Sequence, residues 1–223
     1  MSKPYQLVVF DWEGTISDTL GPILHTIATE ASTLNFGALD PYQARKYVDL
    51  GLVQALKKLF PHLLSAQHEQ LLQTVQQAMV SRPTEVCLIP GAMEFIQQLH
   101  AAKIDIAVAT NKGHQSLLRA LQATGLDGLI KITRSAGQVP AKPCPQMLEE
   151  IMAEFDVDPS LTLMIGDSES DMQMAHSIHV AAVGVDFYHQ QEADLKTAGA
   201  MAVFDDYQLL AHFLKLPNAS TGV

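Results

Sequence analysis

The chain of 223 residues contains little cysteine, few basic side chains and no long apolar run. Its two cysteines, Cys87 and Cys144, are too few for the disulfide framework of a small secreted domain and fit a reducing compartment. No apolar run approaches the ~18 residues of a membrane helix. The first ten residues also do not show the order of a secretory signal, in which a positive segment is followed by an apolar stretch and a small-residue cleavage site. We therefore expect a cytoplasmic protein with no membrane partner.

The charge balance is acidic. Lysine and arginine number 14 against 24 aspartates and glutamates, which gives a formal charge of −10. Such a surface repels phosphate backbones and anionic lipids, so nucleic acid is not expected as a partner. A small anionic substrate remains compatible, because a metal ion and a lysine can make one site locally positive. The sequence leaves both a monomer and a homodimer open.

The 48% of hydrophobic residues supports a well-buried core, and their order indicates an α/β fold. Strands are expected at 7–10, 104–109, 129–132, 161–165, 180–183 and 201–204. Helices are expected at 92–102, 114–124, 145–155, 170–177 and 207–214. This alternation, with strands that are apolar throughout, predicts a doubly wound, mainly parallel sheet of Rossmann-like type.

One stretch interrupts this alternation with helical periodicity alone. Leu52, Ala55, Leu56 and Leu59 form an amphipathic stripe, and a second helical pattern covers 68–80. We therefore predict a catalytic core of residues 1–15 and 87–216 with an inserted helical cap at 16–86. Residues 217–223 are expected to form a flexible tail.

Four polar segments follow or neighbour the predicted strands: 11–15, 110–112, 142–143 and 166–171. In open α/β sheets, ligands bind at the carboxyl ends of the strands. One such segment would be a weak signal, because strand ends often carry turn-forming residues. Four in order across the chain are a much stronger signal of a functional site.

With these segments the sequence resembles the haloacid dehalogenase-like superfamily of phosphohydrolases, and more closely its phosphoglycolate phosphatase-like branch with a helical cap. The family pattern has an Asp-x-Asp-Gly-Thr start, a Ser or Thr after the second strand, a Lys commonly followed by Pro, and a Gly-Asp-x-x-x-Asp end. This chain matches all of it except the second Asp, which is Glu13. The resemblance implies a magnesium-dependent phosphatase that acts on a small phosphorylated metabolite.

Asp11 is the predicted nucleophile, which would attack phosphorus and form an aspartyl-phosphate. An Asp after a strand is usually a turn or cap residue, so this assignment depends on the other three segments. Glu13 would protonate the leaving oxygen and later deprotonate water. By resemblance, its main-chain carbonyl also binds the metal. Glu is one methylene longer than the Asp that the family has here.

The remaining predicted roles concern the metal and the substrate. Carboxylate oxygens suit Mg²⁺, and the expected metal residues are Asp11, Glu13, Asp167 and Asp171. A carboxylate at the start of a helix also complements the helix dipole. That structural role would account for one of Asp167 and Asp171, but less well for both. Lys142 would neutralise the nucleophile and the phosphate, with Lys112 as a second candidate by position. The expected substrate contacts are Thr110, Asn111, Trp12 and Gly51, the last in a stretch at 49–52 that resembles the family's specificity loop.

Several alternatives remain open. A phosphosugar mutase of the same family shares the cap and the nucleophile. A relative that binds a phosphorylated ligand with little turnover would explain Glu13. A dehalogenase fits less well, because the metal and acid–base pattern is retained. A phosphoryl-accepting signalling domain would have no evident need for the helical insert. Release of phosphate from a generic aryl phosphate would discriminate among them.

Overall fold

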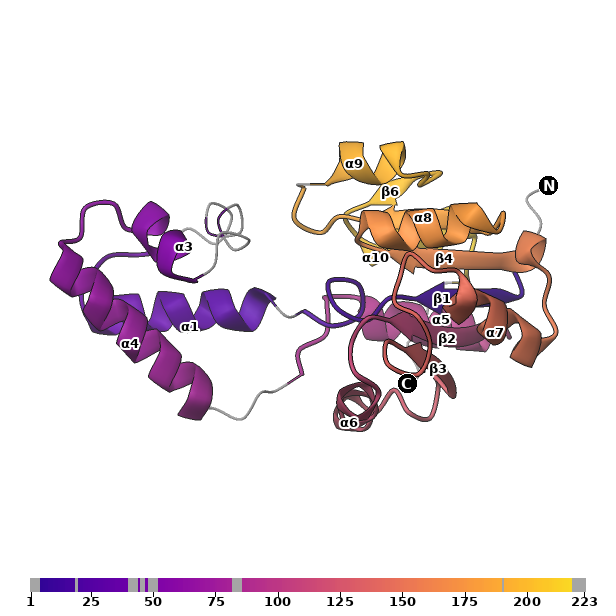
Figure 1. Ribbon diagram of the computed structural model, residues 1–223, viewed down its shortest axis with the longest axis horizontal. Coiled ribbons are helices and arrows are strands. Elements are labelled where there is room, and N and C mark those ends of the chain that lie inside the picture. The colour runs from indigo at the N-terminus through magenta and orange to yellow at the C-terminus, as the bar shows by residue number, and fades with distance from the viewer. Residues whose placement is uncertain are drawn as a thin grey trace. The chain divides into compact units, whose positions relative to one another are not determined.

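A computed structural model describes residues 5–18, 20–39, 44, 47, 52–81, 86–189 and 191–217 of the chain (Figure 1). The chain divides into two compact units. The first combines Met1–Ser17 with Leu88–Val223, and the second is Asp18–Cys87. Each unit is described by itself below.

A six-stranded parallel sheet forms the centre of the first unit. In spatial order its strands are β3 (Ile132–Ser135), β2 (Asp105–Thr110), β1 (Leu7–Phe10), β4 (Thr162–Gly166), β5 (Ala181–Val185) and β6 (Val203–Phe204). The chain adds β2 and β3 on one side of β1, and then β4, β5 and β6 on the other side, so the strand order reverses between β1 and β4. This reversal is typical of doubly wound sheets. The predicted fold class is confirmed.

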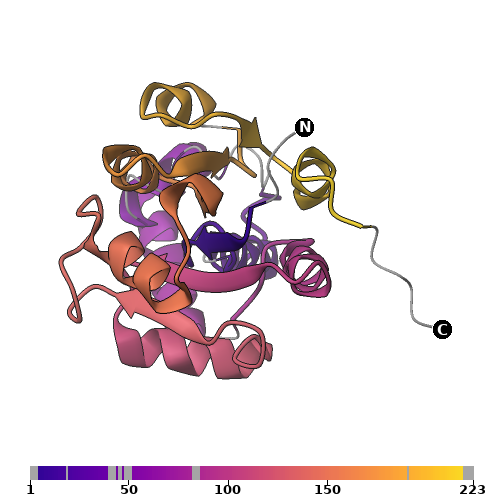
Figure 2. The same cartoon turned by 90° about the vertical axis from the view of Figure 1, so that its right-hand side faces the viewer.

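Helices cover both faces of this sheet (Figure 2). On one face lie α7 (Gln146–Phe155), α8 (Glu169–Ser177) and α9 (Glu192–Thr197), and on the other lie α5 (Ala92–Ala101) and α10 (Tyr207–Phe213). The remaining helices of the unit are α6 (His114–Thr124) and the short 3₁₀ helix η2 (Pro159–Leu161).

The central strand β1 shows why the sheet is buried on both sides. Its four residues are all 0% exposed, and neighbouring side chains point to opposite faces. Leu7 and Val9 join the apolar cluster under α7 and α8. Phe10 instead packs edge-on against Phe95 of α5, with ring centroids 6.0 Å apart. An unbroken apolar strand is thus placed between two helical layers.

The predicted strand at 129–132 is displaced along the chain, since β3 begins only at Ile132. Gly125 ends α6 in the left-handed conformation, with φ of 72°. The amides of Leu129 and Ile130 then both donate to the carbonyl of Leu126. These apolar residues therefore close a turn, and the strand is formed by the more polar residues that follow.

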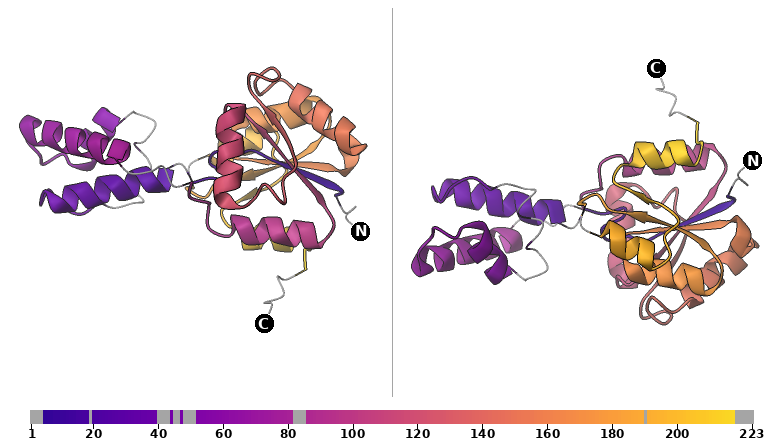
Figure 3. Two further views of the ribbon diagram at one scale, coloured as in Figure 1. Left: turned by 90° about the horizontal axis from the view of Figure 1, so that it is seen from below. Right: turned by 90° about the horizontal axis from the view of Figure 1, so that it is seen from above.

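The second unit consists of helices among the described residues: α1 (Leu20–Thr33), α3 (Leu52–Leu59) and α4 (Ser65–Ser81) (Figure 3). Their buried faces share one apolar cluster that includes Ile27, Leu56, Phe60 and Leu71. The two ends of the unit meet, because the amide of Asp18 donates to the carbonyl of Cys87 at 2.8 Å.

No helix among the described residues is both long enough and apolar enough to span a bilayer. The predicted flexible tail is described only at residue 217, and residues 49–51 lie outside the described part of the chain.

Candidate active site

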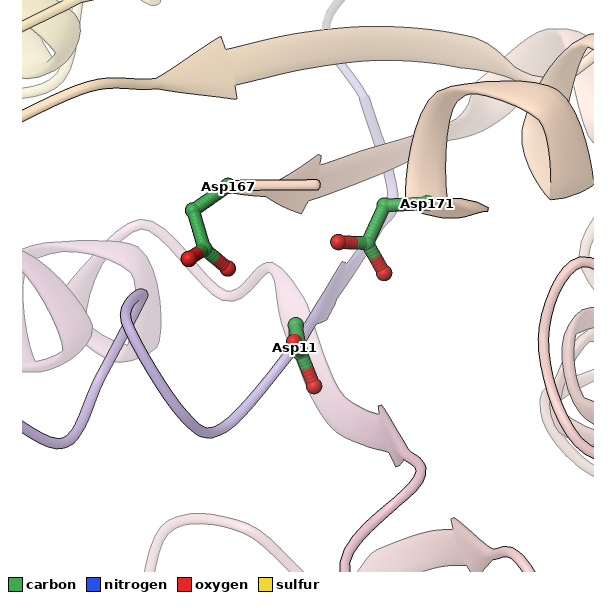
Figure 4. A group of neighbouring side chains, drawn as sticks. All are labelled: Asp11, Asp167 and Asp171. Atoms are coloured by element: carbon green, nitrogen blue, oxygen red, sulfur yellow. The ribbon is translucent and has the colours of Figure 1, made fainter. Parts of the chain in front are cut away.

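Three aspartates meet at the carboxyl end of the sheet (Figure 4). Asp11 follows β1 and Asp167 follows β4, and these strands are neighbours, with Phe10 paired to Ile165. Asp171 comes from the first turn of α8. One carboxylate oxygen from each residue lies within 4.8 Å of the others. The parallel strand order therefore gathers groups that are far apart in sequence.

A single lysine joins two of these carboxylates. The ammonium of Lys142 lies 2.8 Å from Oδ1 of Asp11 and 2.6 Å from Oδ1 of Asp171, and the side chain is 2% exposed. Asn111 anchors the lysine's own loop, because its Oδ1 accepts from the Lys142 amide at 2.9 Å. The lysine is thereby held between the carboxylates of Asp11 and Asp171.

Asp171 is fixed from both sides. While its Oδ1 accepts from Lys142, its Oδ2 accepts from the Ser168 amide at 3.1 Å and the Ser168 hydroxyl at 2.6 Å. This is a capping box in which Asp171 and Ser168 bond reciprocally at the start of α8. The helix cap and the buried ion pair use the same carboxylate. Asp171 therefore stabilises the start of α8 and also belongs to the acidic site.

The balance of charge in the site shifts three pKa values. Burial first, and then the charge of Asp171, raise the pKa of Asp11 to about 6, although Lys142 opposes the rise. Burial, with the charges of Asp11 and Asp171, raises the pKa of Asp167 to about 8. Burial alone would lower the pKa of Lys142, but Asp11 and Asp171 outweigh it and raise that pKa. Three carboxylates with one ammonium leave the site short of positive charge.

The loop after β1 holds Asp167 in place. Gly14 adopts φ of 76°, and a Cβ there would lie 2.0 Å from Oδ2 of Asp167, so the loop backbone passes directly against this carboxylate. The hydroxyl of Thr15 donates to Oδ1 of Asp167 at 3.1 Å. The carbonyl of Thr15 in turn accepts from the buried hydroxyl of Tyr207 at 2.8 Å. Sequence reasoning missed Tyr207, since no local pattern connects it with a residue so far away in the chain.

The predicted substrate residues lie in different surroundings. Thr110 is buried at the end of β2, and its hydroxyl accepts from the Lys112 amide at 3.2 Å. The Asn111 side chain is engaged by the Lys142 amide. Trp12 is 1% exposed, and its amide donates to Oδ1 of Asp11 at 2.6 Å. Gly51 lies outside the described residues.

The Glu13 side chain is not one of the three gathered carboxylates. Its Oε1 lies 2.7 Å from the ammonium of Lys112, and the glutamate side chain is 47% exposed. Lys112 is therefore engaged with Glu13, while Lys142 contacts Asp11.

The donor set fits a hard divalent cation. Asp11, Asp167 and Asp171 offer closely spaced carboxylate oxygens, and burial, with the charges of the neighbouring carboxylates, raises the pKa of Asp11 and of Asp167. Oxygen-only sites of this kind suit Mg²⁺, Ca²⁺ or Mn²⁺ rather than metals that prefer sulfur or imidazole. The cluster could hold a metal ion, and its chemistry does not name which one.

Several known proteins are similar to this chain over most of its length. The "Probable phosphatase IndB" of Dickeya dadantii is 28% identical over 210 residues, which cover 90% of each chain. A phosphoglycolate phosphatase of Mesorhizobium japonicum is 29% identical over 195 residues, or 84% of each chain. A hydrolase from Deinococcus radiodurans R1, solved with bound phosphate and sodium, superimposes with a TM-score of 0.72 at 21% identity, covering 97% of this chain and 99% of that one.

The family model described as "Haloacid dehalogenase-like hydrolase" matches residues 8–185, which include Asp11, Lys142, Asp167 and Asp171. The family expected from the four polar segments is confirmed, together with the likeness to phosphoglycolate phosphatases. The chain belongs to the haloacid dehalogenase-like hydrolase family and is a hydrolase enzyme.

Proposed function

We propose that this hydrolase is a magnesium-dependent phosphatase that cleaves a small phosphate monoester through an aspartyl-phosphate on Asp11. The observation that carries the proposal is the buried Lys142 ammonium shared by Asp11 and Asp171. A phosphomonoester dianion repels an attacking carboxylate, and a fixed positive charge beside both offsets that repulsion. The phosphatase names of the relatives support the same reaction class.

The geometry suggests which oxygen attacks. Oδ1 of Asp11 accepts from the Trp12 amide and contacts Lys142. Within the described residues no donor is seen at Oδ2, so this oxygen would form the bond to phosphorus. The bond from phosphorus to the leaving oxygen breaks, and Glu13 gives that oxygen a proton. Water then attacks the aspartyl-phosphate, Glu13 takes its proton, and phosphate leaves with Asp11 restored.

Magnesium would be held by Asp11, Asp167 and Asp171, with the main-chain carbonyl of Glu13 as the further ligand that the family resemblance implies. The ion supplies positive charge for the phosphoryl oxygens. The protein's own part is to keep the carboxylates together through Thr15, Ser168 and Lys142. The Thr110 hydroxyl would contact a phosphoryl oxygen beside them.

Residues 16–86 are proposed as a cap that selects the substrate. The unit Asp18–Cys87 is compact and has its own apolar core, so its folding does not depend on packing against the catalytic residues. Gly51 and its neighbours would contribute to selection, as the family resemblance implies. The substrate class is a small phosphorylated metabolite, since the acidic chain disfavours larger polyanions.

A substrate screen tests the proposal. Purified protein with Mg²⁺ is offered a panel of phosphorylated metabolites, with 2-phosphoglycolate included, and free phosphate is measured. We expect release from at least one member, loss of release with a chelator, and none from Asp11→Asn. A product that keeps its phosphate at a new position would identify a mutase. No turnover on any member would refute the phosphatase assignment.

A further inference from the structure

An ion pair joins the ends of two neighbouring strands outside the buried cluster. Glu13 lies two residues after Asp11 beyond β1, and Lys112 lies two residues after Thr110 beyond β2. The strands pair in parallel, with Phe10 opposite Val108. Oε1 of Glu13 is 2.7 Å from Nζ of Lys112, and the two side chains are 47% and 25% exposed. The pair therefore lies at the same edge of the sheet as the nucleophile and nearer to solvent.

The lysine is held by a firm turn. Its amide donates to the Thr110 hydroxyl at 3.2 Å, and the intervening Asn111 accepts from the Lys142 amide at 2.9 Å. The residues 110–112 are thus tied both to their own strand and to the loop of the buried lysine. Because the main chain at Lys112 is fixed, its ammonium can restrict the position of the Glu13 carboxyl group that it contacts.

Glutamate needs such a partner more than aspartate would. It has one more side-chain torsion, so a half-exposed glutamate samples more positions when nothing contacts it. Proton transfer requires a carboxyl within about 2.6–3.2 Å of the leaving oxygen. An ion pair with a lysine on an anchored turn reduces that freedom.

We infer that Lys112 is a positioning residue, which holds the Glu13 carboxyl group where it gives a proton to the leaving oxygen and, as the carboxylate, later takes one from water. The inference rests on the proposed function, because it assumes that Glu13 is the acid and base of that reaction. Lys112 acts only through Glu13 and forms no bond to the reacting atoms. Its role is distinct from that of Lys142, which contacts Asp11 itself.

The test uses the dependence on leaving group. Lys112→Met keeps an unbranched side chain that is one atom shorter and removes its charge, while Lys112→Arg keeps the charge. The quantity compared is kcat/KM, which reports the steps up to departure of the leaving group and excludes later hydrolysis of the aspartyl-phosphate. An alkyl phosphate needs a proton on its leaving oxygen, whereas an aryl phosphate needs little help.

Lys112→Met should lower kcat/KM on the alkyl ester by about 10-fold or more, as expected when an acid is displaced by part of an ångström. On the aryl ester the change should stay within about threefold, since only the small acid contribution is lost. Lys112→Arg should recover most of the loss. In a Glu13→Gln background, Lys112→Met should have almost no further effect, because residues that act as a unit are not additive.

A matched control separates positioning from a general loss of charge. Lys196 pairs with Glu192 at 2.5 Å on the exposed face of α9, so Lys196→Met breaks a similar pair elsewhere in the same unit. It should leave both esters unaffected. Thermal unfolding should show that all variants fold, because exposed ion pairs add little stability.

Three results would overturn the inference. Equal losses of kcat/KM on both esters would show that Lys112 acts on the phosphate or on the fold. A full Lys112→Met effect in the Glu13→Gln background would show that it does not act through Glu13. Absence of turnover by the wild-type protein on either ester would overturn the proposed function, and this inference with it.

Discussion

The carboxylates of Asp11 and Asp171 share one buried ammonium, that of Lys142, and the Asp167 carboxylate lies close to both. Removal of the nucleophile should therefore have opposite effects on turnover and on stability. Asp11→Asn should lower kcat by about 10³-fold or more, as other deletions of covalent nucleophiles do. The metal-free protein should be at least as stable as wild type at pH 8, because a mutually repelling charge is gone.

Phosphate release and thermal unfolding in a chelator check the two effects separately. The same substitution at exposed Asp156, at the end of α7, serves as a control for the loss of a carboxylate. Turnover by Asp11→Asn above about one hundredth of the wild-type rate would exclude a covalent role.

The pKa of Asp167 makes the stability of the metal-free protein depend on pH. That pKa is raised to about 8 in the fold, against about 3.9 in an unfolded chain. Between these values the folded protein retains a proton that the unfolded chain releases, so stability falls as the pH rises from about 4 to about 8. Asp11, with a pKa of about 6, adds to the fall over the lower part of the range.

Asp167→Asn should remove most of this dependence. In a chelator, its melting temperature at pH 8 should exceed that of wild type by on the order of a few degrees, with a smaller difference at pH 4. Added Mg²⁺ should stabilise wild type at pH 8 and leave the variant nearly unchanged. A variant that melts below wild type at pH 8 in chelator would contradict the charge balance described here.

Asp11 and Asp167 were predictable from the sequence because each directly follows a buried strand, and the carboxyl ends of parallel strands lie at one edge of the sheet. Lys142 lies in the loop between β3 and α7, and Asp171 lies in the first turn of α8, so these two were assigned through the family resemblance. The partner of Glu13 was not predictable. Lys112 was considered only as a substitute for Lys142, since side-chain pairing across two loops depends on the directions in which both turns project.

At the scale of elements, α10 supports the catalytic loop from the other end of the chain. Tyr207 donates to the Thr15 carbonyl, and Thr15 donates to Asp167. Burial, and then the charge of Asp167, raise the pKa of Tyr207 far above its ordinary value, so the hydroxyl keeps its proton. Its ring stacks on Phe95, with centroids 4.9 Å apart. This helix thus positions a carboxylate that it does not touch.

Tyr207→Phe should keep the ring and remove the donor. The buried Thr15 carbonyl then lacks its partner, which should lower the free energy of unfolding by about 1–3 kcal/mol. Mg²⁺ affinity should also fall, since Thr15 would hold Asp167 less firmly. Denaturant unfolding and calorimetric titration measure the two effects. Tyr5→Phe is the matched control, because the Tyr5 hydroxyl makes only a 3.8 Å contact to the sulfur of Met201. Unchanged Mg²⁺ affinity in Tyr207→Phe would rule out this support.

Element types were more predictable than their limits. The apolar run of β1 allowed its strand to be placed residue for residue, because burial on both faces leaves no ambiguity. The displaced β3 shows the converse. Leu129 and Ile130 lie in the turn after α6, where Ile130 is buried, and a short apolar run does not distinguish a buried turn from a strand.

At the scale of the molecule, the second unit can be removed at a defined point. Ser17 and Leu88 form an antiparallel bridge inside the first unit, so residues 18–87 can be replaced by a short Gly-Ser linker. The shortened protein should fold, since its main apolar cluster lies entirely in the first unit. It should hydrolyse a generic aryl phosphate within about 10-fold of wild type, while its ranking of metabolites should flatten.

Circular dichroism and the metabolite panel check this prediction. A deletion variant that keeps the wild-type ranking would show that selection resides in the first unit. One that folds but is inactive on every ester would show that residues 18–87 supply part of the chemistry.

The contact between the ends of the second unit also bears on how the sheet assembles. β1 must pair with β2, with Leu7 opposite Asp105, across the whole inserted segment. Joining the ends of so long a flexible loop loses chain entropy. Once the helices of the second unit have packed, the hydrogen bond from Asp18 to Cys87 brings the two chain ends together. The folded second unit thereby shortens the effective loop between β1 and β2. Disruption of the apolar cluster around Phe60 should therefore slow refolding of the sheet, although Phe60 is not part of that sheet.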